Sequence, residues 1–350
     1  MSRFAFIPPS CVQPVQARVV VFPEPLRAVL ASEPLGKPGS GEVLVESLYS
    51  LVSTGTELTA YTGSFQPGSA WARYVKYPFK PGYSSVGRVI EVGDGVEGVE
   101  VGSVVAAPAP HADRYVWRAG ELVKVPPQVG LEEAAFHTLA AGVMHAVRLA
   151  GVKLGEAVVA VGAGLLGQLA VQFSRLAGAF PVIAVDLSDY RLELAAKSGA
   201  DIVVNAARED PMAAVREATG GRMADAVFEV TGDPSVLPQA IKLARGMGRL
   251  VVLSSPRGSS TLDFHDEVNS PSRVIIGTHF YSQPEAETPY YPWTWRRNRE
   301  LFFSMLASGR ASVKHLISHV FPFEEAPKAY EMLHKSRLQC MGVLFSYARG

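Results

Sequence analysis

The stretch of sequence that decides the fold is EAVVAVGAGLLG, which spans residues 156–167. Its first six residues are mostly apolar and β-branched, a pattern typical of a short buried strand. Gly162, Gly164 and Gly167 follow at once and open an apolar helical segment with G-x-G-x-x-G spacing. In that spacing the first glycine permits a tight turn, the second admits a pyrophosphate, and the third lets helix and strand pack closely. The stretch therefore predicts the nucleotide-binding turn of a parallel α/β sheet.

An acidic residue stands where such a turn needs one. Asp186 ends the next apolar segment, about 20 residues after the glycines, where a carboxylate accepts hydrogen bonds from an adenosine ribose. Because this carboxylate would repel a 2′-phosphate, the expected cofactor is NAD rather than NADP. Arg191 is a further candidate beside the adenosine, and Thr231-Gly232 lie in a loop expected to pass near the cofactor. The predicted cofactor-binding residues are Gly162, Gly164, Leu165, Leu166, Gly167, Asp186, Arg191, Thr231 and Gly232.

Strands and helices alternate on either side of this turn. Apolar, β-branched strands are expected at 156–161, 181–186, 201–204, 225–230, 249–253 and 273–276. Helices are expected at 165–177, 189–197, 212–216 and 235–245. Strands that are apolar on both faces and alternate with helices indicate a parallel sheet covered on both sides. The expected fold class is α/β, with a doubly wound parallel-sheet domain.

The residues before this region show a different pattern. Residues 17–130 consist of short apolar runs separated by Gly and Pro, which predicts an all-β segment forming a small barrel, with a hairpin turn at 93–95. An alanine-rich helix is expected at 131–150. We expect the tail from 280, which has a helix at 300–308 and a strand at 341–345, to fold back onto the barrel. The predicted domains are therefore 1–135, 136–279 and a return segment, 280–350.

Composition narrows the classes of partner. The chain has 350 residues, with 33 Lys and Arg against 33 Asp and Glu, so its formal net charge is zero. A neutral chain has no strong field to attract nucleic acid or an anionic membrane surface, and no apolar run is long enough to span a bilayer. Two cysteines, Cys11 and Cys340, are too few for a disulfide framework or a cysteine-built zinc site. The N-terminal stretch has no export pattern, and we expect a cytoplasmic protein that acts on a small molecule.

The order of barrel, dinucleotide-binding domain and return segment resembles the medium-chain dehydrogenase/reductase superfamily, the zinc-type alcohol dehydrogenase-like proteins. The resemblance covers essentially the whole chain and implies a GroES-like β-barrel domain and a Rossmann domain with a substrate cleft between them. It implies an oxidoreductase that moves hydride between a nicotinamide and its substrate. It also implies a homodimer, because members usually pair the last strand of the nucleotide sheet, here near 273–278, across a two-fold axis.

The chain departs from zinc-dependent members of that superfamily at the metal-ligand positions. Thr54 stands where the first ligand, a cysteine, is expected, and Tyr83 stands where the second, a histidine, is expected. The third position matches His137. One histidine with a threonine and a tyrosine is a poor zinc site, since zinc takes about four N, S or carboxylate ligands in a tetrahedron. We therefore expect neither a catalytic nor a structural metal.

Without zinc, side chains must polarise the substrate oxygen. The candidate catalytic residues are Tyr83, His137, Thr56, Thr54 and Glu57. Tyr83 can donate a phenolic hydrogen bond, His137 can exchange a proton near neutral pH, and Thr56 matches a proton-relaying hydroxyl of the relatives. Structural interpretations stay open: Tyr83 as part of the cleft wall, His137 as a hydrogen-bonded histidine at a helix start, and Glu57 as a structural acid. The remaining histidines, including His111, show no partner in the sequence.

The expected function combines these features. Aromatic residues between Tyr61 and Tyr77 and the loop at 290–299 suit a ring-shaped, hydroxyl-bearing substrate, although they could instead clamp the tail on the barrel. The leading prediction is a zinc-independent oxidoreductase that transfers hydride between NAD(H) and a secondary alcohol or ketone, with a sugar, cyclitol or other ring hydroxyl as substrate. Residues 53–57 and 81–83 are also similar to those of bacteriochlorophyllide hydroxyethyl dehydrogenases. A quinone or enone reductase and a non-catalytic NAD-binding sensor remain as alternatives.

Overall fold

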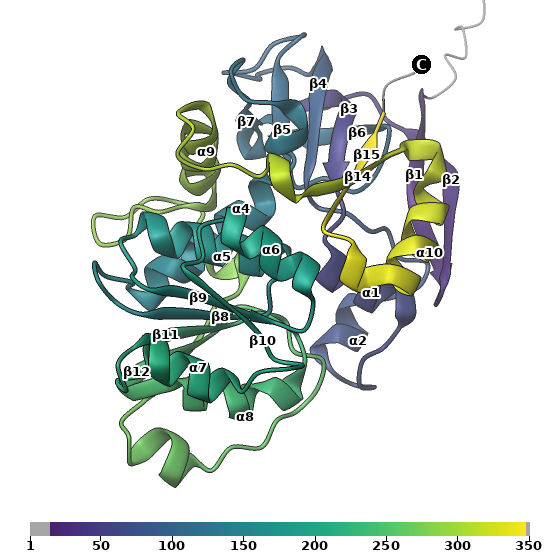
Figure 1. Cartoon of the computed structure of the whole chain (residues 1–350). Helices are drawn as coiled ribbons and strands as arrows, with labels where there is room; N and C mark the ends of the chain where they lie inside the picture. Colours follow the sequence, from purple (N-terminus) through teal and green to yellow (C-terminus); the bar gives the residue numbers. More distant parts are fainter. Residues whose placement is uncertain (1–14, 348–350) are drawn as a thin grey trace, which may run out of the picture.

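Six parallel strands form the sheet that the glycine-rich turn predicts. The computed structural model describes residues 15–347 and places these strands in the order β10-β9-β8-β11-β12-β13 (Figure 1). Their bounds are β8 Val158–Val161, β9 Val182–Asp186, β10 Ile202–Asn205, β11 Ala224–Glu229, β12 Ala244–Val252 and β13 Val274–Gly277. The helices around the sheet are α4 His137–Ala150, α5 Leu165–Leu176, α6 Asp189–Lys197, α7 Pro211–Ala218 and α8 Leu237–Ala240. Cys11 and most of the N-terminal stretch lie outside the described residues.

Both faces of this sheet are buried, which explains why its strands are apolar throughout. Val158 and Ala160 of β8 belong to the core that includes α4 and α5. Val159 and Val161 of the same strand belong to a second core on the opposite face, beside α7. Figure 1 shows α4, α5 and α6 on one side of the sheet and α7 and α8 on the other. The doubly wound parallel sheet predicted from the sequence is confirmed.

A seven-stranded sheet forms the GroES-like part of the molecule. Its order is β14-β15-β3-β4-β5-β7, and β6 also pairs with β3. The bounds are β3 Glu42–Leu51, β4 Ser85–Val92, β5 Val104–Ala107, β6 Arg114–Arg118, β7 Val123–Lys124, β14 Ile317–Pro322 and β15 Gly342–Ser346. β15, from the tail, pairs antiparallel with β3. The exact domain boundaries, 135/136 and 279/280, stay predictions.

The remaining elements surround these two sheets. β1 (Val15–Glu24) and β2 (Arg27–Leu35) form a separate two-stranded sheet, beside which α10 (Ala326–Ser336) lies (Figure 1). α9 (Trp295–Ala307) packs along α4 and begins five residues earlier than predicted. Among the residues that the structure describes, no helix combines the length and apolar character needed to cross a bilayer.

Three local predictions are wrong. Residues 17–130 are not all β, because α1 (Thr54–Thr62) and α2 (Ala70–Tyr74) lie within them. The turn at 93–95 does not close a tight hairpin, since β4 ends at Val92 and β5 begins only at Val104. The alanine-rich helix is divided into α3 (Leu131–Ala134) and α4.

The sequence of α1 explains why pattern analysis misses it. Its sequence, TGTELTAYT, is rich in threonine and contains a glycine, both poor helix formers. Leu58, Ala60 and Tyr61 are buried in the GroES-like part, so tertiary packing stabilises the helix despite its low propensity. This helix carries part of the site described below.

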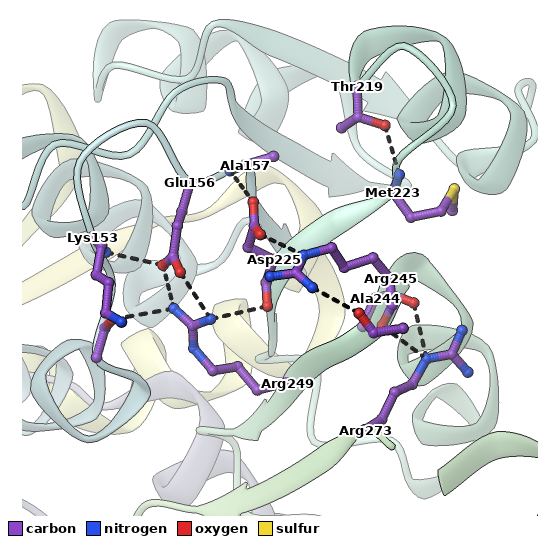
Figure 2. A network of polar contacts seen from close by, with 12 residues as sticks. Lys153, Glu156, Ala157, Thr219, Met223, Asp225, Ala244, Arg245, Arg249 and Arg273 are labelled. Atoms are coloured by element: carbon purple, nitrogen blue, oxygen red, sulfur yellow. Dashed lines mark hydrogen bonds and ion pairs between the residues drawn. The ribbon is translucent and has the colours of Figure 1, made fainter. Parts of the chain in front are cut away.

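A network of polar contacts connects the amino ends of the Rossmann strands (Figure 2). Asp225 accepts hydrogen bonds from the Ala157 N–H at 2.8 Å and from Arg245 Nε at 2.6 Å. Arg249 forms an ion pair with Glu156 and donates to the Asp225 carbonyl at 3.2 Å. These contacts join β8, β11 and β12 at one edge of the sheet. The carboxyl ends of the strands, at the opposite edge, are where a ligand is expected in this fold.

Candidate functional site

The glycine-rich turn between β8 and α5 has the geometry that a dinucleotide requires. Gly162 has φ +102°, and a Cβ there would meet the Thr231 backbone nitrogen at 3.1 Å. A Cβ on Gly167 would lie 1.9 Å from the Gly162 carbonyl oxygen. These positions therefore demand glycine, one for the left-handed turn and the other for close packing of helix on strand.

The amino end of α5 forms an open cradle. Gly164 caps the helix without a side-chain hydrogen bond, and the first-turn N–H groups of Leu165, Leu166 and Gly167 have no acceptor among residues 15–347. The space around Gly164 is open: within 4 Å a Cβ there would meet only Arg191 Nη1, at 3.9 Å. Unpaired N–H groups and the positive end of a 12-residue helix fit a phosphate group.

Asp186 is fixed beside this cradle. Its Oδ2 accepts from the Ala163 N–H at 2.7 Å, and its Oδ1 accepts from the Leu187 and Ser188 N–H groups at 2.8 and 2.9 Å. Arg191 Nη1 lies 3.9 Å from the carboxylate. Asp186 and Arg191 therefore lie close together at the carboxyl ends of the strands, next to the glycine turn. This is where residues that contact the adenosine end of a dinucleotide are expected.

Thr231 and Gly232 lie in the loop after β11, against the same turn. The buried Glu229 carboxylate accepts from the Thr231 N–H at 2.6 Å and from its hydroxyl at 2.5 Å. It also accepts from the Ser254 hydroxyl, so one carboxylate holds together the loops after β11 and β12. Gly232, with φ +75°, follows in a left-handed conformation.

Two arginines that the sequence pattern does not indicate, Arg337 and Arg257, lie near Asp186 and Arg191. Arg337, in the segment between α10 and β15, has its pKa lowered to about 10 by burial and by the positive charges of Arg257 and Arg191, while Asp186 acts in the opposite sense. Arg191 Nη2 donates to the Arg337 carbonyl at 2.7 Å. Arg257, in the loop after β12, reaches Thr59 of α1 at 3.4 Å. Three guanidinium groups thus accompany one carboxylate, an excess of positive charge suited to phosphates.

A cluster of hydroxyl groups lies in the GroES-like part, where α1 begins and just before β4. Tyr83 Oη donates to Ser53 Oγ and lies 3.2 Å from Thr56 Oγ1. Burial raises the pKa of Tyr83 well above its usual range, and the charge of Glu57 raises it further, although the hydrogen bonds between Tyr83 and the Ser53 and Thr56 hydroxyls act in the opposite direction. The phenol is therefore protonated at neutral pH. Thr54 is half-buried at the start of α1, beside this cluster in the sequence.

Glu57 and His137 have partners within the protein interior. The Glu57 carboxylate accepts from the Ser53 N–H at 2.8 Å and contacts His111 and Tyr330. The ring of His137 lies 3.2 Å from the Ser85 carbonyl through Nε2, and burial together with Arg299 lowers its pKa well below the usual value. The structure therefore brings together Tyr83 and Thr56 and adds Ser53, whereas His137 is a neutral, hydrogen-bonded residue at a helix start.

The ligand positions of zinc-dependent relatives do not fit a metal in this chain. Across residues 15–347, no three His, Cys, Asp or Glu side chains lie close enough to hold a metal ion. His137 is directed to the Ser85 carbonyl, and Tyr83 to hydroxyl groups. Neutral hydroxyls with a single histidine do not make the tetrahedral donor set that zinc requires.

The predicted aromatic cleft separates into two groups. Trp71 packs with its ring centroid 6.5 Å from Phe65 and 6.2 Å from Tyr74, and Tyr74 is near enough to Tyr83 to help raise the pKa of that phenol. The loop at 290–293 does not join them, because it lies against α4, where Arg148 stacks 3.7 Å from the ring centroid of Trp293. Among the described tail residues, Tyr281 is near enough to Tyr74 to help raise its pKa to about 12, after burial, the main cause.

Comparisons with known proteins identify the family of the chain. Residues 39–122 match the family described as the alcohol dehydrogenase GroES-like domain, and residues 166–295 match the family described as zinc-binding dehydrogenase. The L-threonine 3-dehydrogenase of Bacillus licheniformis is 29% identical over 335 residues, which cover 87% of this chain and 91% of that protein. The L-threonine 3-dehydrogenase of Pyrococcus horikoshii is 29% identical over 343 residues, covering 89% and 93%.

Solved structures share the fold over almost the whole chain. The 2R,3R-butanediol dehydrogenase of Bacillus subtilis superposes with a TM-score of 0.79 at 22% identity, covering 95% of this chain and 100% of that chain. An Escherichia coli alcohol dehydrogenase complexed with NADH gives 0.80 at 20% identity, covering 95% and 99%. A zinc-binding dehydrogenase of Sinorhizobium meliloti bound to NADP gives 0.78 at 19% identity, covering 95% and 99%. With its GroES-like and Rossmann parts both matched, the chain belongs to the zinc-type medium-chain dehydrogenase/reductase superfamily.

Proposed function

We propose that this chain is a zinc-independent oxidoreductase that transfers hydride between NAD(H) and a secondary alcohol or its ketone. The observation that carries the proposal is the cluster of Tyr83, Ser53 and Thr56 hydroxyls. By the resemblance, Tyr83 stands at a metal-ligand position of zinc-dependent relatives, and Ser53 and Thr56 lie on either side of Thr54, which stands at another. The substrate class proposed is a sugar, a cyclitol or another ring-bearing hydroxyl compound. Tyr74, which is near Tyr83, and Trp71, which packs against Tyr74, offer apolar faces for such a ring.

The dinucleotide would extend from the hydroxyl cluster to Asp186. The amino end of α5 fits one phosphate, and Arg257 and Arg337 supply positive charge for the other. Asp186 would accept hydrogen bonds from the adenosine ribose and disfavour a 2′-phosphate, which supports NAD over NADP. When bound, the nicotinamide supplies or accepts the hydride.

Tyr83 would act as the acid in carbonyl reduction. As hydride reaches the carbonyl carbon, the Tyr83 hydroxyl gives its proton to the carbonyl oxygen, leaving a phenolate and an alcohol. The Ser53 and Thr56 hydroxyls donate hydrogen bonds to that phenolate until solvent restores its proton. Alcohol oxidation reverses each transfer. The phenol is neutral before reaction and so holds the proton that the carbonyl oxygen takes up, although its raised pKa makes it a weaker acid than a solvent-exposed tyrosine.

Zinc independence rests on the replaced ligands. Thr54 and Tyr83 are neutral hydroxyls, and His137 is engaged with the Ser85 carbonyl. The names of the relatives, threonine and butanediol dehydrogenases, support a hydroxyl substrate of this chain without identifying it. A quinone or enone reductase and a non-catalytic NAD-binding sensor are the alternatives.

One experiment separates these functions. Chelator-treated protein, with its metal content measured, is supplied with NAD or NADH and a panel of secondary alcohols, ketones, quinones and enones. Turnover of alcohols and ketones without metal supports the proposal. Turnover of only quinones or enones favours the first alternative, and cofactor binding with no turnover favours the sensor.

A further inference from the structure

A line of buried polar side chains adjoins the hydroxyl cluster. His111 Nε2 lies 3.0 Å from Glu57 Oε2, and His111 Nδ1 lies 2.7 Å from Ser50 Oγ. Ser50 Oγ is 2.8 Å from Tyr347 Oη, and Tyr330 Oη donates to Glu57 Oε2. The side chains of His111 and Glu57 are 0% and 1% exposed. The line thus joins α1, β3, α10 and the segments after β5 and β15 inside the GroES-like part.

Packing alone does not require such a line. Burying a carboxylate and an imidazole is costly, and apolar side chains of similar volume would fill the same space without that cost. Here both oxygens of Glu57 have hydrogen-bond donors. Oε1 accepts from the Ser53 N–H at 2.8 Å, and Oε2 accepts from the Tyr330 hydroxyl and from His111 Nε2. A network whose members are all hydrogen-bonded fixes their orientation. Its most direct effect is on the backbone of Ser53.

Ser53 connects this network to the reactive cluster. It is the N-cap residue of α1, yet its side chain makes no capping hydrogen bond. An N-cap serine normally stabilises its helix by accepting from a first-turn N–H group. Here the Ser53 hydroxyl accepts from Tyr83 instead, and Glu57 holds the Ser53 N–H. The Ser53 hydroxyl therefore contacts Tyr83 and does not cap the helix.

We propose that Glu57 and His111 form a positioning unit that acts through Ser53 to hold the Tyr83 hydroxyl where it meets the substrate oxygen. The inference deepens the proposed function and rests on it. Glu57 is not part of a proton relay, because its link to Ser53 runs through a backbone N–H. His111 fixes the carboxylate from the side opposite Ser53, and Ser50 fixes His111 in turn.

The positioning unit also places a negative charge near the phenol. The titratable groups around Tyr83 are Glu57 and Tyr74, with His111 and Tyr330 behind Glu57. The carboxylate opposes the phenolate form of Tyr83, so replacing it with a neutral amide should favour that form. The proposal therefore predicts two effects of Glu57→Gln, one on kcat for ketone reduction and one on the pH at which Tyr83 titrates.

The first test compares Glu57→Gln with wild type in ketone reduction over a pH series. The expected result is a roughly 10- to 100-fold loss in kcat, because the loss from a displaced proton donor outweighs the gain in acidity that follows from removing the carboxylate charge. KM for NADH stays unchanged, and the alkaline limb of the pH profile moves to lower pH. The control is Asp225→Asn, which alters a carboxylate at the amino edge of the Rossmann sheet, far from the cleft. A Glu57→Gln enzyme with control-like kcat and pH profile would overturn the proposal.

The second test needs no turnover. Phenolate absorbance is titrated in wild type and Glu57→Gln, and each is compared with a matching protein that also carries Tyr83→Phe. The difference isolates Tyr83, and its titration is expected at lower pH in Glu57→Gln. If wild type reduces no carbonyl, the proposed function fails while this measurement still reports on the coupling. An unmoved Tyr83 titration counts against the positioning unit.

A third variant, Ser53→Ala, tests the same path without altering the buried carboxylate, whose replacement could impair folding. It removes the hydroxyl that contacts Tyr83 but keeps the N–H that Glu57 holds. The loss in kcat should match that of Glu57→Gln, and the double variant should lose no more, because both changes interrupt one path. Fully additive losses would show that Glu57 does not act through Ser53 and would overturn the inference.

Discussion

At the scale of single residues, position 83 separates this chain from zinc-dependent relatives. A phenol there donates to Ser53, which the sequence indicates only as part of the segment 53–57. The glycines and Asp186 could be predicted, because their roles follow from local spacing along one strand-turn-helix unit. Ser53, His111, Arg257 and Arg337 could not, because tertiary structure brings them to their partners from distant segments. A serine, a histidine or an arginine without a local motif does not indicate which residues it contacts in the folded protein.

The role of Asp186 can be tested by substitution. Asp186→Ala removes acceptors for the ribose hydroxyls, so NAD should bind roughly 10- to 100-fold more weakly, the usual cost of hydrogen bonds to a charged group. The preference for NAD over NADP should narrow at the same time. Calorimetric titration with both dinucleotides measures the change. Asp201→Ala is the matched control, since Asp201 also accepts from a backbone N–H, that of Val182 at 2.8 Å. Unchanged cofactor preference in Asp186→Ala would contradict the assignment.

At the scale of elements, the sequence predicts the Rossmann part more fully than the GroES-like part. β8, α5, β9 and α6 follow the expected segments closely, because an apolar strand, a glycine turn and an amphipathic helix each leave a local pattern. α1 leaves none, since its threonines and glycine disfavour helix and only burial stabilises it. The helix that carries Ser53 and Thr56 is therefore the element hardest to predict.

The junction of β8 and α5 offers a test at this scale. Gly167→Ala would place a Cβ 1.9 Å from the Gly162 carbonyl oxygen, so the helix must move away from the strand. Overpacking of this kind costs about 1–3 kcal/mol in the free energy of unfolding, and the displaced cradle should also weaken NAD binding. Denaturant unfolding and dinucleotide titration measure both effects. Gly120→Ala, where a Cβ meets nothing within 4 Å, should change neither. A Gly167→Ala protein as stable as the control would refute the close packing.

At the scale of the whole molecule, segments far apart in sequence build one site. β15 pairs with β3, and the segment before β15 places Arg337 near Asp186. α1, from the GroES-like part, meets Arg257 from the Rossmann part through Thr59. The proposed dinucleotide path thus runs between the two parts, from Tyr83 to Asp186.

The edge strand β13 of the Rossmann sheet is the surface through which we expect two chains to form a dimer. β13 is the last strand of the sheet, and its Val274 and Ile275 are 51% and 37% exposed. We expect two chains to pair along this edge, because an exposed apolar edge strand invites pairing. Light scattering should give twice 37.5 kDa, and Val274→Lys should shift the protein toward monomer. Leu154→Lys, which changes an exposed leucine elsewhere, should leave the dimer intact. A wild-type monomer would contradict the expected assembly.

The most direct measurement of the central claim is kcat for ketone reduction by chelator-treated wild type, Tyr83→Phe and Tyr115→Phe. Tyr115 is a control buried in the core of the GroES-like part. The account predicts that wild type and Tyr115→Phe reduce the ketone with NADH in the absence of zinc. Tyr83→Phe should lose about 100-fold or more in kcat, the usual contribution of a general acid, while still binding NADH. Activity that appears only after zinc is added, or that survives unchanged in Tyr83→Phe, would contradict it.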